Sequence, residues 1–169
     1  MHLSIPDIVK ATKKLSILPE WSEGDYYSEF RVPVEIGGVT YEGLDFRGKA
    51  GGSNPNQQVM FQLDYKPIGF TVGPLCRFDW RPQYPHVNIM KGPPDLKGRR
   101  FGFYETHFHD FELNWLVKEK RMRRDNLPIA RPVEKDPETF EELTIVVERL
   151  FNIEGITDIP RPLWQPKLL

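Results

Sequence analysis

Alternation of apolar and polar residues predicts most of the secondary structure in the first half of the chain. The clearest case is residues 31–46, where valines and an isoleucine alternate with polar residues up to Gly37-Gly38 and apolar positions resume beyond them. Two alternating runs joined by two glycines predict a β-hairpin. Because Pro33 has no N–H group to donate, we expect the first of these strands at an edge of its sheet.

The same period of two predicts two further strands. Residues 59–65 alternate as a half-buried strand does, and residues 75–80 place Cys76, Phe78 and Trp80 on one face and Arg77 and Asp79 on the other. The aromatic-rich residues 101–111 are also expected to be extended. Residues 49–56 have the glycine, serine and asparagine content of a loop.

Helical patterns occupy the two ends of the chain. Ser4 is a candidate N-cap for a short amphipathic helix to about Leu15. Near the other end, Asp136 is a candidate N-cap with Pro137 at the first helical position, and apolar residues recur at helical spacing to about Asn152.

A proline-rich tail, residues 159–166, follows the second helical pattern, and its Trp164 is expected to pack on the body. The sequence therefore predicts a single α+β domain over residues 1–169. We expect a mostly antiparallel sheet with an N-terminal and a C-terminal helix flanking it.

Composition narrows the class of protein. Cys76 is the only cysteine among 169 residues, so an internal disulfide and a cysteine-based zinc cluster are both excluded. Cys76 lies on the apolar face of its strand and is expected to be an inert core thiol. No apolar run reaches membrane-spanning length and no signal peptide is apparent, so we expect a cytoplasmic protein without membrane contact.

Charge is distributed unevenly along the chain. The formal net charge is −1, yet residues 77–125 hold 11 Lys and Arg against 7 Asp and Glu. A local positive field of this kind attracts phosphates, although such runs also occur as plain solvated loops. The candidate nucleic-acid-binding residues are Arg99, Arg100, Lys118, Lys120, Arg121, Arg123 and Arg124.

Three histidines fall among these charges in two short extended segments. His107 and His109 are two residues apart on a strand, so their side chains point the same way at about 6.6 Å. His86 and Asn88 form a second such pair, and Arg77 and Asp79 a third. If the segments pair, the three rings, Arg77 and Asp79 meet in one place. The candidate catalytic residues are His86, His107, His109, Arg77, Asp79 and Asn88.

These residue types suit more than one chemistry. Histidines exchange protons near neutral pH, so they could act as general acid and base in phosphodiester cleavage without a metal, with Arg77 stabilising charge on phosphorus and Asp79 orienting a ring. Alternatively, His86, His107 and His109 could hold zinc, with Asp79, Asp110 or water as the fourth ligand. The cluster could also be a structural hydrogen-bond network.

The order Arg77-x-Asp79, Pro85-His86-x-Asn88 and His107-x-His109, followed by a helix ending Leu150-Phe151-Asn152-Ile153, resembles a family of small prokaryotic proteins of unknown function. It is more distantly similar to toxins of TumE-type toxin–antitoxin pairs. The resemblance covers residues 75–155 and implies a toxin-like or defence role acting on RNA. The basic insertion between His86 and His107 departs from the family pattern.

Three functions follow as expectations. The leading one is a toxin-like or defence-associated, RNA-directed phosphodiesterase that needs no cofactor, with a cognate antitoxin or another protein as partner. The second is a non-enzymatic interaction or inhibitor protein in phage–host conflict, which binds an acidic partner through the basic segment. The third is a metal-dependent hydrolase with zinc.

Overall fold

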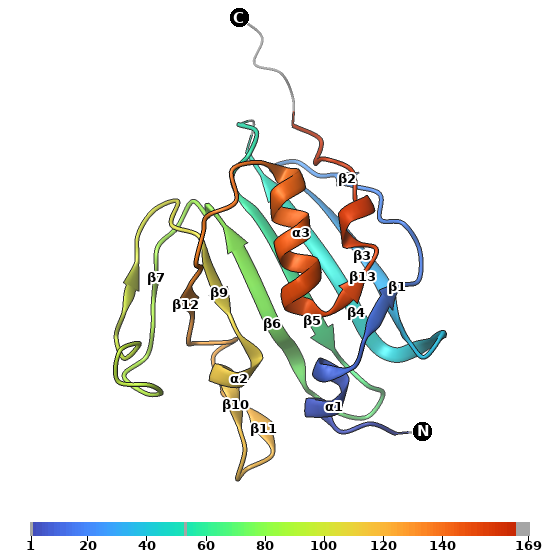
Figure 1. The fold of residues 1–169 in the computed structure, drawn as a ribbon, viewed down its shortest axis with the longest axis vertical. Helices are drawn as coiled ribbons and strands as arrows, with labels where there is room; N and C mark the ends of the chain where they lie inside the picture. The colour runs from blue at the N-terminus through green and yellow to red at the C-terminus, as the bar shows by residue number, and fades with distance from the viewer. Residues whose placement is uncertain (1, 53, 165–169) are drawn as a thin grey trace, which may run out of the picture.

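The computed structural model describes residues 2–52 and 54–164, and within them nine strands form one mostly antiparallel sheet (Figure 1). In spatial order eight of these are β12 (Arg131–Pro132), β9 (His107–His109), β6 (Gly73–Trp80), β5 (Val59–Tyr65), β4 (Val39–Gly51), β3 (Tyr27–Ile36), β1 (Lys13–Leu15) and β13 (Ile153–Glu154). The ninth, β2 (Ser22–Glu23), pairs with β3. Only β1 and β13 are parallel, so the predicted α+β class with a largely antiparallel sheet is confirmed.

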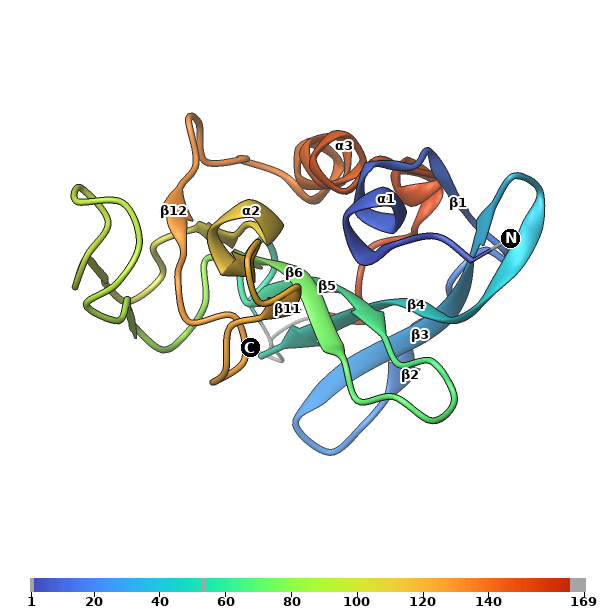
Figure 2. The same ribbon diagram turned by 90° about the horizontal axis from the view of Figure 1, so that it is seen from below.

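The core lies between this sheet and α3 (Phe140–Phe151). Phenylalanines from the central strands face the helix, as in the edge-to-face contact of Phe46 with Phe151 at 5.8 Å between ring centroids. Phe108 of β9 lies 5.9 Å from the same Phe151 ring. Burial of each such ring stabilises the fold by roughly 2–3 kcal/mol. Figure 2 shows α3 and the short α1 (Ile5–Lys10) on the same side of the sheet.

The glycine hairpin forms as predicted between β3 and β4. Gly37 and Gly38 have φ of 63° and 79°, left-handed values that glycine adopts without strain. The expectation that Pro33 marks an edge strand is wrong, because β3 lies between β4 and β1. Pro33 is accommodated instead at a register shift in the β3–β4 ladder, the other place where a strand tolerates proline. The predicted loop at 49–56 begins later, since β4 continues to Gly51.

The N-terminal helix is shorter than expected. Ser4 caps it as predicted by accepting from the Asp7 amide, but the helix ends at Lys10 rather than near Leu15. Lys13 is the reason, because its side chain folds back under the helix and is only 1% exposed. Its Nζ donates to the carbonyls of Ile8, Val9 and Ala11 at 3.1, 2.8 and 2.7 Å, which satisfies the helix C-terminus and starts β1.

The C-terminal helix also begins later than predicted. Its N-cap is Thr139, whose hydroxyl accepts from the Glu142 amide, and not Asp136. Asp136 is used elsewhere, because its carboxylate accepts from the Thr106 hydroxyl and pairs with Arg81. Pro137 therefore precedes the helix, while the predicted end near Asn152 is confirmed by a left-handed Asn152 cap with φ of 52°.

Smaller elements gather at the β9–β12 end of the sheet. Residues 82–106 form a lobe that contains β7 (His86–Val87) and β8 (Arg100–Phe101), which pair only with each other. After β9 come α2 (Phe111–Asn114) and then a basic hairpin, residues 115–124, built on β10 (Trp115–Leu116) and β11 (Arg121–Met122). The expected extended run at 101–111 is thus two short strands separated by a loop.

A 3-10 turn, η1 (Ile156–Asp158), follows β13, and beyond it Trp164 packs edge-on against Phe140 as predicted. Gln165 and Pro166 of the expected tail lie outside the described residues. Among the residues that the structure describes, no helix is long and apolar enough to cross a bilayer.

Candidate functional site

Pairing of β6 with β9 brings the predicted side chains together. In this ladder Asp79 lies opposite His107 and Arg77 opposite His109. Because Phe78 and Phe108 point into the core, the four polar side chains emerge on the face turned away from α3. The expectation that the two segments pair and share one polar face is confirmed.

His86 completes a group of three imidazoles, although it comes from the lobe rather than from the main sheet. Its ring centroid lies 5.6 Å from that of His107 in a stacked arrangement and 4.6 Å from that of His109. His107 and His109 are 5.0 Å apart. The structure therefore unites all three predicted histidines with Arg77 and Asp79, which we call the histidine cluster.

Burial divides this cluster into an interior part and a rim. His107 and His109 are 2% and 0% exposed, whereas the side chains of Arg77 and Asp79 keep 16% and 15% of their surface accessible. His86 is half-buried. A large substrate therefore meets Arg77, Asp79 and His86 first, and the other two rings support them from beneath.

Hydrogen bonds define the protonation of His109. Its Nδ1 lies 2.7 Å from the Leu127 carbonyl, which only accepts, so Nδ1 carries the proton. Burial lowers the pKa of His109 to about 4, although Asp79 opposes the shift. The ring is therefore neutral at pH 7, and its Nε2 accepts from Arg77 Nη2 at 3.1 Å.

His107 has the same anchor but a different partner at Nε2. Its Nδ1 lies 2.8 Å from the Glu105 carbonyl and therefore donates. Its Nε2 faces Asp79 Oδ2 at 3.4 Å.

Asp79 is the anionic centre of the cluster. Its Oδ2 accepts from Arg77 Nε at 3.0 Å and lies 3.2 Å from His109 Nε2. Burial alone would raise the pKa of this carboxyl, but His107, His109 and Arg77 together hold it well below its usual range. Asp79 is therefore ionised, and Arg77 holds it and His109 in one fork of donors.

Asn88, predicted as a catalytic residue, is buried and fully engaged in hydrogen bonds. Its Nδ2 donates to the carbonyls of Leu96 and Ala130 at 3.0 and 2.8 Å. Its Oδ1 accepts from the Ala130 amide at 2.8 Å and lies 2.9 Å from His86 Nε2. Because the carbonyls fix the orientation of the amide, His86 Nε2 is the donor to Oδ1. Asn88 thus positions His86.

A second buried asparagine mirrors this arrangement and was not predicted. Asn114 donates to the carbonyls of Asp110 and Ile129 and accepts from the Ile129 amide. Asn114 thus holds the backbone of Ile129, and Asn88 holds the backbone of Ala130 next to it. The only sequence signal for Asn114 is an isolated amide within the apolar run that surrounds it.

His86 is the ring best placed for proton exchange with solvent. Burial lowers its pKa, the bond to Asn88 opposes the shift, and the charges of His107 and Arg77 lower it further. His86 is therefore neutral at pH 7 and able to accept a proton.

A metal ion would find a different set of ligands from the one expected. Ligand atoms of Asp79, His107 and His109 lie within 4.8 Å of one another, and both rings are anchored through Nδ1 as metal-binding histidines usually are. His86 is not in this group, because its Nε2 is turned to Asn88. Asp110, the other candidate ligand, pairs with Arg131 at 3.0 Å. Arg77 Nη2 already donates to Nε2 of His109, so a metal ion at this nitrogen would have to displace Arg77.

The predicted nucleic-acid-binding residues fall in two places. Arg99 and Arg100 lie on the β7–β8 part of the lobe, where the Arg99 guanidinium covers the Phe101 ring at 5.3 Å. The other five lie on the basic hairpin, Arg121 on β11 itself. The lobe with β7 and the hairpin with β10 and β11 both lie at the β9–β12 end of the sheet (Figure 1).

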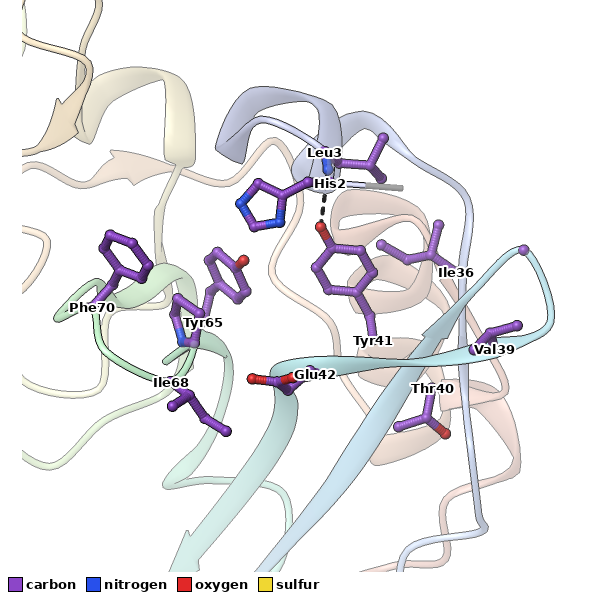
Figure 3. Close-up of a pocket in the computed structure, with 12 residues that line it drawn as sticks. His2, Leu3, Ile36, Val39, Thr40, Tyr41, Glu42, Tyr65, Ile68 and Phe70 are labelled. Atoms are coloured by element: carbon purple, nitrogen blue, oxygen red, sulfur yellow. Dashed lines mark hydrogen bonds between the residues drawn. The ribbon is translucent and has the colours of Figure 1, made fainter.

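The structure also contains a hollow that lies away from the histidine cluster. One of about 560 Å³ lies on the other side of the molecule, between the N-terminus, the β3–β4 hairpin and residues 65–70 (Figure 3). The Leu3 amide donates to the Tyr41 hydroxyl across it. Its lining is mostly apolar, and His2, the fourth histidine, contributes to it. His2 is exposed, as expected.

Comparison with known proteins finds no relative: no family model, curated protein or solved structure matches this chain. The resemblance to TumE-type toxins therefore stays a prediction. A function has to be argued from the histidine cluster and its surroundings.

Proposed function

We propose that this chain is an RNA-directed phosphodiesterase of toxin or defence type that works without a metal ion. One observation carries the proposal: Arg77 joins Asp79 and His109 in a network that leaves His86 at the rim, with His107 stacked beneath it. The cluster thus combines a cation for the phosphate with two adjacent imidazole rings, the side chains that acid–base cleavage uses.

In the proposed reaction the 2′-hydroxyl of RNA attacks the adjacent phosphorus. Neutral His86 takes the hydroxyl proton, and the new P–O2′ bond forms as the P–O5′ bond breaks. The leaving O5′ takes its proton from His107 in the protonated form, the ring stacked directly beneath His86. The products are a 2′,3′-cyclic phosphate and a 5′-hydroxyl.

Arg77 and the buried residues support this step in different ways. The guanidinium of Arg77 faces charge that develops on the phosphoryl oxygens, and its accessible side chain can reach them. Asp79 faces Nε2 of His107 at 3.4 Å and orients that ring, and neutral His109 holds Arg77 in place. In this scheme His109 and Asn88 are positioning residues.

Exposed aromatic side chains on the lobe favour a single-stranded substrate. Tyr84, Phe103 and Tyr104 are 72%, 65% and 47% exposed, and the Tyr104 amide bonds to the Pro82 carbonyl at 2.8 Å. Such rings stack on unpaired bases and tolerate any sequence. Trp80, another aromatic beside the cluster, is fully buried and serves the core.

The test is cleavage of a mixed RNA pool by the wild type, His86→Gln and His2→Gln, each with and without EDTA. His2→Gln is the matched control, because it removes an exposed imidazole far from the cluster. We expect EDTA-resistant cleavage that is lost in His86→Gln and kept in His2→Gln, with 2′,3′-cyclic phosphate ends. A folded wild type that does not cleave would refute the proposal and favour the non-enzymatic interaction protein.

The second candidate is a metal-dependent hydrolase, favoured by the convergence of Asp79, His107 and His109. Zinc there would be held by two Nε2 atoms and a carboxylate oxygen, with an open position for water. This candidate predicts one zinc per chain in purified protein and activity that EDTA abolishes and zinc restores. Resistance of cleavage to EDTA would eliminate it.

A further inference from the structure

A small hollow lies between the lobe and the basic hairpin. Its volume is about 210 Å³, below the range of 300–1,000 Å³ typical of pockets that enclose a whole small molecule. The size suits a single phosphate group rather than a nucleotide. We call it the basic hollow; its lining consists of Ile89, Lys91, Leu116, Arg121, Arg123, Arg124 and Asp125.

The basic hollow concentrates positive charge that the protein itself does not neutralise. Four of its lining residues are cationic and one is acidic. Within residues 2–52 and 54–164, no ion pair joins any of the four cations to a carboxylate. By contrast, Arg77, Arg81 and Arg131 each pair with an aspartate nearby. Unpaired like charges around one hollow favour an anion that bridges them.

Two short chain connections place the basic hollow next to the cluster. Ile89 in its lining follows Asn88, which bonds to His86. On the opposite side, Asp125 is two residues before Leu127, whose carbonyl accepts from His109. The lining of the hollow is therefore linked along the chain to two of the groups that orient rings of the candidate active site.

The second of these connections is held in a strained conformation. Asp125, Asn126 and Leu127 have φ of 71°, 59° and 59°, three successive left-handed residues without a glycine. Such strain persists only where the surroundings enforce it, and it collects at functional sites. Here the Arg123 amide donates to the Asn114 carbonyl at 2.7 Å and Arg123 Nε donates to the Leu113 carbonyl at 3.0 Å, which fixes the hairpin end of the turn.

We propose that the basic hollow binds a backbone phosphate of single-stranded RNA and so places the neighbouring phosphodiester at the histidine cluster. This inference rests on the proposed function, because it names the subsite that holds the substrate of that cluster. The lobe contributes Lys91 and the exposed aromatic rings for bases, and the hairpin contributes Arg121, Arg123 and Arg124. Arg99, Arg100 and Lys118, although basic, do not line the subsite.

The experiment measures binding of a fluorescein-labelled 12-nucleotide oligouridine by anisotropy, in a His86→Gln background that prevents cleavage. The test variant is Lys91→Gln/Arg121→Gln/Arg124→Gln. Its matched control is Lys14→Gln/Lys66→Gln/Lys135→Gln, which removes the same charge from exposed positions outside the lobe and the basic hairpin. Arg123 is kept because its Nε bonds to the backbone.

We expect the test variant to bind at least 10-fold more weakly at about 0.1 M salt and the control to change by less than 3-fold. Since each phosphate neutralised on a single strand contributes about 0.7 to the slope of log K against log salt, loss of the one phosphate held in the hollow should make the slope shallower by about 0.7 in the test variant alone. Equal weakening of both variants, or no binding by the parent protein, would overturn the inference.

Failure of this inference and failure of the proposed function give different results. If the wild type cleaves RNA but the two triple variants bind alike, the function stands and the subsite is wrong. If only the test variant loses binding but the wild type never cleaves, the basic hollow is an RNA-binding site of a protein that is not a nuclease.

Discussion

Replacing Asn88 by alanine removes four hydrogen bonds from a buried position. The side chain bonds to the Leu96 carbonyl, to both backbone groups of Ala130 and to His86. Each bond contributes about 1 kcal/mol net, and the backbone groups left behind have no access to water. We therefore expect the free energy of unfolding to fall by about 3–5 kcal/mol, a large part of the roughly 5–15 kcal/mol typical of a domain.

The assay is urea unfolding followed by tryptophan fluorescence, with three variants compared at one pH. Asn114→Ala removes three equivalent bonds but no contact to a histidine, so it should cost about as much stability. His86→Gln removes one of the four Asn88 bonds and should cost about 1 kcal/mol. If Asn88→Ala destabilised the protein by no more than His86→Gln does, the view of Asn88 as a structural clamp would be wrong.

Three more predictions concern stability and activity. Burial lowers the pKa of Lys13 to about 8, so this lysine loses its proton at a lower pH in the folded state than in the unfolded state. Between pH 7 and pH 10 the free energy of unfolding of the wild type should therefore rise by about 2–3 kcal/mol relative to Lys13→Met. A difference between the two proteins that stays constant with pH would contradict this. Asp125→Gly relieves a left-handed conformation with φ of 71° and should stabilise the fold by roughly 0.5–1 kcal/mol in the same urea assay; a loss of stability would argue against strain. Arg77→Lys keeps the positive charge but loses the guanidinium group that bonds to both Asp79 and His109. RNA cleavage should fall at least 10-fold, with little change in affinity for oligouridine. Unaltered cleavage would show that Arg77 has no part in the mechanism.

Elements with a clear hydrophobic period were predictable from the sequence. The β3–β4 hairpin and the two faces of β6 follow from strict alternation, and the pairing of residues 77–79 with 107–109 follows from their matched polar faces. Lys13 shows where the pattern misleads, because a lysine counted as polar surface is buried beneath a helix end. Asp136 misleads similarly, since it looks like a cap but is used in a tertiary contact with Arg81.

The support of the cluster could not be predicted, because it depends on backbone groups. The carbonyls of Glu105 and Leu127 orient His107 and His109, and a carbonyl has no signature in the sequence. The same holds for Ala130, whose amide and carbonyl engage Asn88. The residues that form the histidine cluster could be named from the sequence. Which of them are buried and which are accessible at its rim could be seen only in the folded structure.

The late position of the groups that support the histidine cluster has a consequence for synthesis of the protein. All three histidines of the cluster precede residue 110, yet the groups that orient two of them come from residues 127 and 130. A nascent or truncated chain that ends before Leu127 therefore contains every proposed proton-transfer residue but lacks the carbonyl that orients His109 and the backbone groups that hold Asn88. Under the proposed function, activity would appear only after most of the chain has been made.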